Sequence, residues 1–145
     1  MSFTPAYRVV ATDTDTNKFW VACNMPSASA VNAVDMDVNG IPTKFSDGIG
    51  FIVPTDCTLV KMYCTSMVSV YTASGTESIK VSKNGTVVLT ATSSTISAIG
   101  NYNWSTTGSV SFAAGDKIYC ADALSLLANF TRRSAAVMEF SVTVV

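Results

Sequence analysis

The stretch KVSKNGTVVLTAT, residues 80–92, carries an Asn-Gly pair between two runs of alternating side chains. Asn84 and Gly85 suit the tight turn in which both central residues have positive φ, and this turn matches the twist of paired strands. The pairs expected across the hairpin are Lys83–Thr86, Ser82–Val87, Val81–Val88, Lys80–Leu89 and Ile79–Thr90. One face of the hairpin is then apolar and the other mixed, which predicts an antiparallel sheet with one side in a core.

The composition supports a β protein whose surface is poor in charge. Ser and Thr make 36 of the 145 residues, and only 13% of the chain is charged, against about a quarter in ordinary domains. The length suits one domain with a sizeable core. A surface with so few charges favours association, so we expect a large buried interface between subunits.

Short extended runs separated by turn residues predict an all-β sandwich or barrel, with no long helix. The expected strands are 7–11, 18–23, 50–53, 58–66, 78–83, 86–92, 109–113, 117–120 and 135–144. Between them, residues 95–108 are rich in Ser, Thr, Gly and Asn and are expected to form a loop. Tyr102 and Trp104 in this loop are candidates for contacts with a partner. Alternatively, they fold back over the end of the sandwich.

Two of these strands have apolar residues on both faces. In the last strand, Ala136 and Met138 point one way while Val137 points the other. In the run 58–66, strict alternation places Leu59 and Tyr63 on one face. The residues expected on outward apolar faces, and so in a trimer interface, are Val60, Met62, Cys64 and Val137.

The four cysteines, Cys23, Cys57, Cys64 and Cys120, lie among apolar neighbours and form no C-x-x-C pair. Cys57 and Cys64 are an odd number of positions apart on one expected strand, so they face opposite ways and cannot bridge there. Two interpretations stay open. The cysteines are buried thiols that pack as small hydrophobic groups, or some form disulfides, including one from Cys23 or Cys120.

Several functional classes find no support. The chain has no histidine, which excludes Ser-His and Cys-His mechanisms and most zinc sites, and its few acids show no glycosidase pattern. A net charge of −1 argues against nucleic-acid binding. No apolar run approaches the roughly 18 residues that cross a bilayer, and no leader is evident, so we expect a protein made in a cytosol. We predict no enzyme activity and no cofactor.

One motif resembles the start of a calcium loop. Asp35, Asp37 and Asn39 stand at alternate positions before Gly40, as oxygen ligands do in such loops. The twelfth position is Ser46 and not Glu, so a turn rich in Asx residues is the competing interpretation. No metal is expected beyond this weak calcium candidate.

Residues 1–47 differ from the remainder because they contain a small-residue stretch without a strong pattern. We interpret them as an extended N-terminal arm with short strands, followed by a sandwich domain over residues 48–145. An extended arm can lie along a neighbouring molecule. Its aromatic contact candidates are Tyr7, Phe19 and Trp20.

Four motifs together resemble the trimeric jelly roll shared by tumour necrosis factor and the complement globular heads, in the versions found in tailed-phage structural proteins. They are Val53-Pro54-Thr55-Asp56, Lys83-Asn84-Gly85-Thr86, Ala114-Gly115-Asp116-Lys117 and the apolar terminal strand 135–145. The resemblance covers residues 48–145, and Cys57 departs from it where Gly is common. It implies an all-β jelly-roll β-sandwich of two antiparallel sheets that assembles as a homotrimer.

The resemblance implies a non-enzymatic virion protein. The leading hypothesis is a trimeric capsid decoration, or cement, protein that binds the major capsid protein at three-fold positions. It would lie on the outer capsid surface after assembly in the host cytoplasm, without nucleic acid or membrane as partners. The alternative is a tail-fibre or head-fibre knob that binds a host receptor glycan. A secreted ligand of the same fold is the third possibility.

Overall fold

The computed structural model describes residues 16–25 and 33–143. Apart from one short 3-10 helix, η1 at Phe45–Asp47, its regular elements are strands. They are β1 (Thr16–Asn24), β2 (Ala33–Val38), β3 (Ile41–Pro42), β4 (Phe51–Ile52), β5 (Cys57–Ala73), β6 (Glu77–Lys83), β7 (Thr86–Thr92), β8 (Gly100–Phe112), β9 (Lys117–Leu124) and β10 (Asn129–Thr143).

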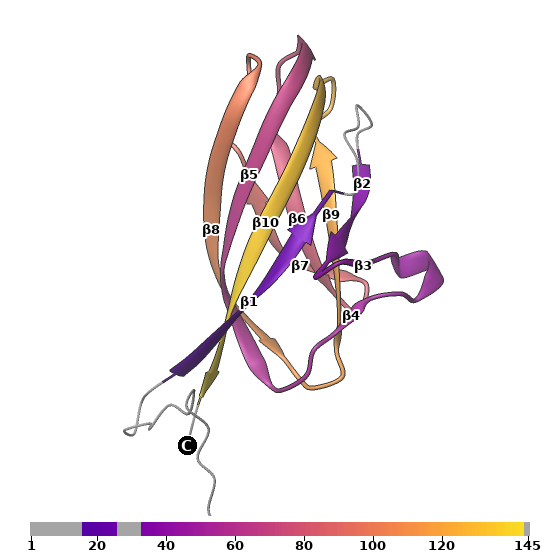
Figure 1. The fold of residues 1–145 in the computed structure, drawn as a ribbon, viewed down its shortest axis with the longest axis vertical. Coiled ribbons are helices and arrows are strands. Elements are labelled where there is room, and N and C mark those ends of the chain that lie inside the picture. The colour runs from indigo at the N-terminus through magenta and orange to yellow at the C-terminus, as the bar shows by residue number, and fades with distance from the viewer. Residues whose placement is uncertain (1–15, 26–32, 144–145) are drawn as a thin grey trace, which may run out of the picture.

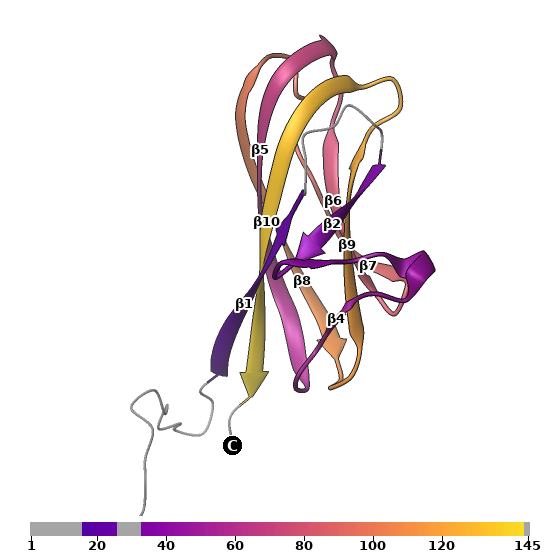
Figure 2. The same cartoon turned by 45° about the vertical axis from the view of Figure 1, so that its right-hand side comes forward.

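The long strands form two antiparallel layers, which Figure 1 and the turned view in Figure 2 show one behind the other. The front sheet has the order β1-β10-β5-β8, and the back sheet has the order β2-β9-β6-β7. At one edge β2 pairs with β1 as well as with β9, so the two sheets are continuous there. At the other edge β7 lies against β8. The sandwich is therefore nearly closed into a barrel.

This strand order is that of a jelly roll, and it confirms the predicted fold class. Apart from the β6–β7 hairpin, successive long strands alternate between the sheets. When the chain comes back to a sheet, the new strand therefore pairs with strands that are distant in sequence. The terminal strand β10, for example, lies between β1 and β5. Figure 1 shows β10 in that central place in the front sheet.

The Asn-Gly turn forms as predicted, but part of the hairpin register is wrong. Asn84 and Gly85 have φ values of 51° and 94°, which both central positions of this turn require. Lys83 pairs with Thr86, and the register then shifts beyond Ser82 so that Val81 faces Leu89. A β-bulge inserts one extra residue on β7, and a turn signal carries no information about a bulge several residues away.

A second bulge reverses the predicted faces of β5. The pairing of β5 with both neighbours shifts between Leu59 and Lys61, at Val60. Strict alternation would place Met62 and Leu59 on opposite faces of β5, yet both side chains are fully buried. The expected faces were therefore wrong from the bulge onward, because one inserted residue exchanges the two sides of a strand.

The predicted loop 95–108 was also wrong for most of its length. Residues 100–112 form β8, which pairs with β5 throughout. Its outward positions carry Asn, Ser and Thr, and its inward positions include Tyr102 and Trp104. The segment is polar because it is an edge strand with one solvent-facing side, and composition alone made it resemble a loop.

The described part of residues 1–47 belongs to the sandwich. β1 pairs with β10 over its whole length, and β2 pairs with β9. A further turn at Asn39-Gly40, with φ values of 48° and 77°, joins β2 to β3. The strand candidate at 7–11 lies outside the described residues. The stretch expected to be an arm thus supplies an edge strand to each sheet.

The interior has two apolar clusters with a polar layer between them. The larger cluster includes Met36, Leu59 and Phe140, and the smaller one includes Val68 and Phe130. Along β10 the inward side chains change from apolar Ala136 through Ser134 and Arg132 to apolar Phe130, and all four are buried. The remaining buried polar groups of this layer are Ser66, Glu77, Ser93 and Asp122.

Candidate interaction surface

The outward side of the front sheet exposes several large apolar side chains among Ser, Thr and Asn residues. We call this surface the front face, defined by the outward residues of β1, β10, β5 and β8. Across these strands the registers align Ala22, Val137, Tyr63 and Ser105 in one row. The large apolar side chains exposed on it are Trp20 (57%), Val70 (52%), Met67 (51%), Tyr63 (44%) and Val137 (39%).

An open hollow of about 500 Å³ lies over β5, β8 and β10, next to this row. Its lining combines the outward side chains with intervening backbone from the three strands. The lining residues are Tyr63, Cys64, Thr65, Asn103, Trp104, Ser105, Ala135, Ala136 and Val137. With neutral side chains only, such a hollow suits an apolar or aromatic group of a partner.

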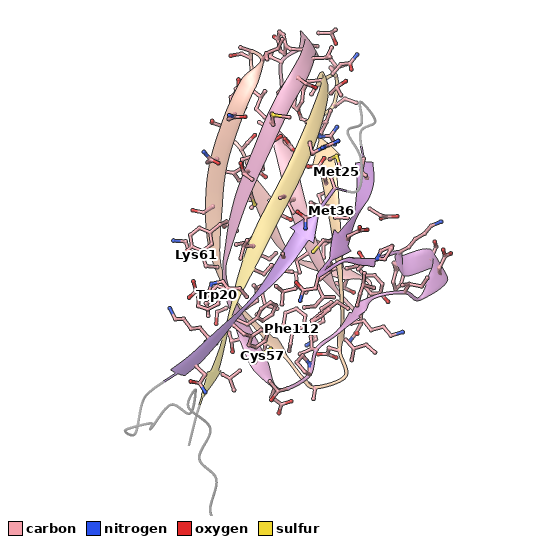
Figure 3. The ribbon with its side chains drawn as sticks, in the orientation of Figure 1. Trp20, Met25, Met36, Cys57, Lys61 and Phe112 are labelled. Carbon is pink, nitrogen blue, oxygen red and sulfur yellow. The ribbon has the colours of Figure 1, made fainter. Side chains whose placement is uncertain are left out.

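Three of the four charged side chains on the front face, Lys18, Glu139 and Lys61, have a partner within it. Lys18 and Glu139 form an ion pair of 2.7 Å between Nζ and Oε1. The hydrogen bond to Glu139 raises the pKa of Lys18. Lys61 lies over the ring of Tyr63, with Nζ 4.6 Å from the centroid. Figure 3 shows Trp20 and Lys61 on this side of the sheet. A partner could therefore cover the part of the face around Trp20 and Tyr63 without leaving an isolated charge buried, whereas Arg133, exposed beside Met67, would need an acidic group of the partner or access to water.

The predicted interface residues divide between the two sides of the sheet. Val137 is exposed on the front face, and Val60 is partly exposed at the bulge. Met62 and Cys64 point into the core instead. Burial also raises the pKa of the Cys64 thiol to about 12, so it stays protonated and behaves as a small apolar group.

The two distal aromatics are not loop residues. Tyr102 and Trp104 lie on the inward side of β8, against the smaller and larger apolar clusters respectively. The Tyr102 hydroxyl donates a hydrogen bond of 2.8 Å to the carbonyl of Ala98. Both rings therefore pack inside the sandwich, under the front sheet. The alternative interpretation also placed them against the sandwich, although at its end and within a loop.

The three aromatics expected in the arm have different positions. Tyr7 lies outside the described residues. Phe19 faces inward and stacks on Phe140, with ring centroids 5.0 Å apart and an interplanar angle of 5°. Trp20 follows it on the opposite side and is exposed on the front face, opposite Glu139 of β10. Only Trp20 of the described pair is available to a partner.

The calcium candidate takes the form of a strand and a turn. Asp35 and Asp37 lie on β2, and Asn39 lies in the turn that follows. The side-chain oxygen of Asn39 accepts a hydrogen bond of 2.8 Å from the backbone nitrogen of Ala22. Over the described residues no group of three or more potential ligands is placed to hold a metal. Asn39 thus lies in a turn, and its side chain binds the neighbouring strand β1.

The polar layer behind the front face contains three charged groups that sequence reasoning missed. Arg132 of β10 donates to Asp122 of β9 through Nε at 2.8 Å and also through Nη2. Its Nε lies 3.5 Å from Glu77 of β6. The hydroxyl of Ser134 donates to Glu77. One oxygen of each carboxyl has no protein partner.

Burial raises the pKa of Asp122 to about 8, and the neighbouring Glu77 adds to this, while Arg132 acts in the opposite direction. With one proton on the acid pair, the layer has one positive and one negative charge and is neutral overall. The sequence contained one signal for this position. Arg132 and Ala136 are an even number of positions apart on one strand, so their side chains share its inward side.

Comparisons with known proteins give only a distant likeness. No known family matches the chain, and no curated protein matches it. Among solved structures it is similar to the Eiger tumour necrosis factor of S. frugiperda, with a TM-score of 0.46 and 9% identity over 88% of this chain and 94% of that one. No helix in the described part of the chain is long and apolar enough to span a membrane.

Proposed function

We propose that this protein is a non-enzymatic virion protein: a homotrimer that decorates the outer surface of a phage capsid. The observation that carries the proposal is the front face, where five large apolar side chains are exposed on one sheet of a chain with few charges. A monomer that exposes such a face tends to associate.

The energy available from this face suits assembly between copies. Covering a side chain that is half exposed stabilises an interface by about 1 kcal/mol, from about 25 cal/mol per Å² of apolar surface. Trp20, Tyr63, Met67 and Val137 together would contribute several kcal/mol at each subunit contact. A closed ring of three copies repeats this contact three times.

A trimer of this kind fits a capsid decoration role. Its three-fold axis would match a local three-fold axis of the shell, and each subunit would contact the major capsid protein. Three weak contacts held in one rigid body bind as a unit, with an apparent affinity that exceeds the single contact by a factor of about 100 or more.

The first test is the molar mass of the purified protein by light scattering on a sizing column. Three copies of the 15.3 kDa chain give about 46 kDa. Val137→Glu places a charge on the front face and should shift the mass toward the monomer. Val87→Glu is the matched control, because Val87 is also exposed (52%, against 39% for Val137) and lies on β7 of the other sheet. A monomeric wild type, or equal effects of both variants, would contradict this assembly.

The second test is sedimentation with capsids that lack the protein. Wild type and Val87→Glu should bind, and a monomeric Val137→Glu should bind about 100-fold more weakly, since it loses avidity. A trimer that does not bind capsids would keep the assembly and remove the decoration role.

The alternative function, a fibre knob that binds a host receptor, is favoured by a separate observation. At the end where β5 finishes and β8 and β10 begin (Figure 1), the connecting segments expose Ile99 (66%), Leu126 (86%) and Leu127 (83%). Hydrogen bonds link these connections, including Ser125 N to the carbonyl of Thr76. Binding to intact host cells that Leu126→Ser abolishes, without loss of the trimer, would support this function.

A further inference from the structure

Two cysteines from opposite sheets meet inside the sandwich. Cys23 lies on β1 of the front sheet and Cys120 on β9 of the back sheet, 97 residues later. Their sulfur atoms are 2.8 Å apart, and the residues are 0% and 1% exposed. Both thiols are free in the structure.

The backbone holds both cysteines at the same corner of the fold. β2 pairs with both sheets, and its residue Val38 faces Cys23 while Met36 faces Cys120. Val38 and Met36 are only two positions apart on one strand and are both fully buried. Figure 3 shows Met36 at this corner, between β2 and the strands behind it. The meeting of the two thiols therefore follows from strand pairing as well as from side-chain orientation.

We propose that Cys23 and Cys120 are a covalent modification site: they form a disulfide between the two sheets when the chain folds in the presence of a disulfide oxidant such as oxidised glutathione. One thiolate attacks the oxidant and forms a mixed disulfide, which releases one glutathione. The second cysteine loses its proton, displaces the bound glutathione and closes the bond. Two protein thiols are oxidised, and one glutathione disulfide is reduced to two glutathione molecules.

The other two cysteines are excluded by position as partners of Cys23. Cys64 on β5 is separated from Cys23 by the strand β10, where Ala136 faces both. Two strand spacings place their backbones about 10 Å apart, which is beyond the reach of a disulfide. Cys57 is at the far end of β5, opposite Phe112. The site therefore predicts one specific pairing.

Burial sets the time at which the bond can form. Oxidised glutathione cannot reach two side chains that are almost fully buried, and burial raises the pKa of Cys120 well above its usual range, so its thiol stays protonated. Oxidation should therefore occur while the chain folds. Protein that has already folded in the reduced state should resist the same oxidant.

The test is to unfold the reduced full-length chain in guanidinium and refold it in a glutathione redox buffer or with a non-thiol reductant. Oxidative refolding should lower the intact mass by about 2 Da, the mass of two hydrogen atoms, and leave two free thiols instead of four. Peptide mapping without reduction should join Cys23 to Cys120. Closing so long a loop should raise the melting temperature on the order of 10 °C.

Two variants and one time course make the result specific. Cys64→Ala should keep the mass loss and the cross-link, whereas Cys23→Ala should lose both. Adding oxidised glutathione to the folded, reduced wild type should leave four free thiols for hours. Four free thiols after oxidative refolding, a link through Cys57 or Cys64, or rapid oxidation of the folded protein would each overturn the proposal.

Discussion

Replacing Arg132 by Met tests the polar layer directly. Met has a similar length and no charge, so the change keeps most of the packing and removes the guanidinium. It removes the two hydrogen bonds that Arg132 donates to Asp122 and its ion pair with Glu77. Both carboxyl groups are fully buried and would be left facing each other without a cation.

The expected loss is large for one side chain. Removing one partner of a buried ion pair costs about 3–5 kcal/mol, because the remaining charge is buried without compensation. Since domains unfold with about 5–15 kcal/mol in total, the variant should lose roughly a fifth or more of its stability. At about 2–4 °C for each kcal/mol in a chain of this size, the melting temperature should fall by about 10 °C.

The assay is urea unfolding near neutral pH and again near pH 5, followed by circular dichroism. Arg133→Met is the matched control, because Arg133 is the next residue and is exposed on the opposite side of β10. It should change the free energy of unfolding by less than about 0.5 kcal/mol. Arg132→Met should regain part of its loss near pH 5, where both acids can take up protons. Equal effects of the two variants, or a loss independent of pH, would refute the reasoning.

Three further outcomes are expected. Burial raises the pKa of Asp122 to about 8, so the folded chain holds a proton that the unfolded chain releases near pH 4. The free energy of unfolding should therefore fall as the pH rises from about 4 to 8, by at most about 1.4 kcal/mol per pH unit. In urea titrations, Asp122→Asn should flatten this slope. Gly85→Ala should lower stability by about 1–3 kcal/mol, and by more than Gly115→Ala. Both glycines have positive φ, but only at Gly85 would the added Cβ meet the Phe45 ring, at 2.2 Å. Equal shifts of the two variants in calorimetry would contradict this. A calcium chelator should leave the melting temperature unchanged. A clear decrease would instead support the hypothesis of a calcium site at Asp35.

The sequence predicted the parts of the fold that depend on local chemistry. The Asn84-Gly85 turn formed because few residues adopt positive φ twice in succession. The motif at 114–117 also lies at a turn, where Oδ2 of Asp116 accepts a hydrogen bond of 2.9 Å from the nitrogen of Ala113. The inward residues of the last strand were also correct, since an uninterrupted alternation has only two possible phases.

The errors arose where distant strands decide the outcome. The bulges near Val60 and on β7 have no marked residue type, so the periodicity that was correct on one side of each became wrong on the other. β8 is paired with β5 through a long-range contact that its polar composition concealed. The charged layer was missed because Arg132, Glu77 and Asp122 come from three strands that only the tertiary fold brings together.

The buried charges and the apolar front face explain each other along β10. A slip of one residue would turn Ala135 and Val137 inward, and these are apolar enough to fill the core, so the hydrophobic pattern discriminates weakly between the two registers. A slip that puts Thr131 in the place of Arg132 would leave Asp122 and Glu77 without the guanidinium between them, at a cost of several kcal/mol, whereas the opposite slip would put Arg133 in that place. A strand that has apolar residues on both sides therefore depends on its inward arginine to disfavour one of the two slipped registers.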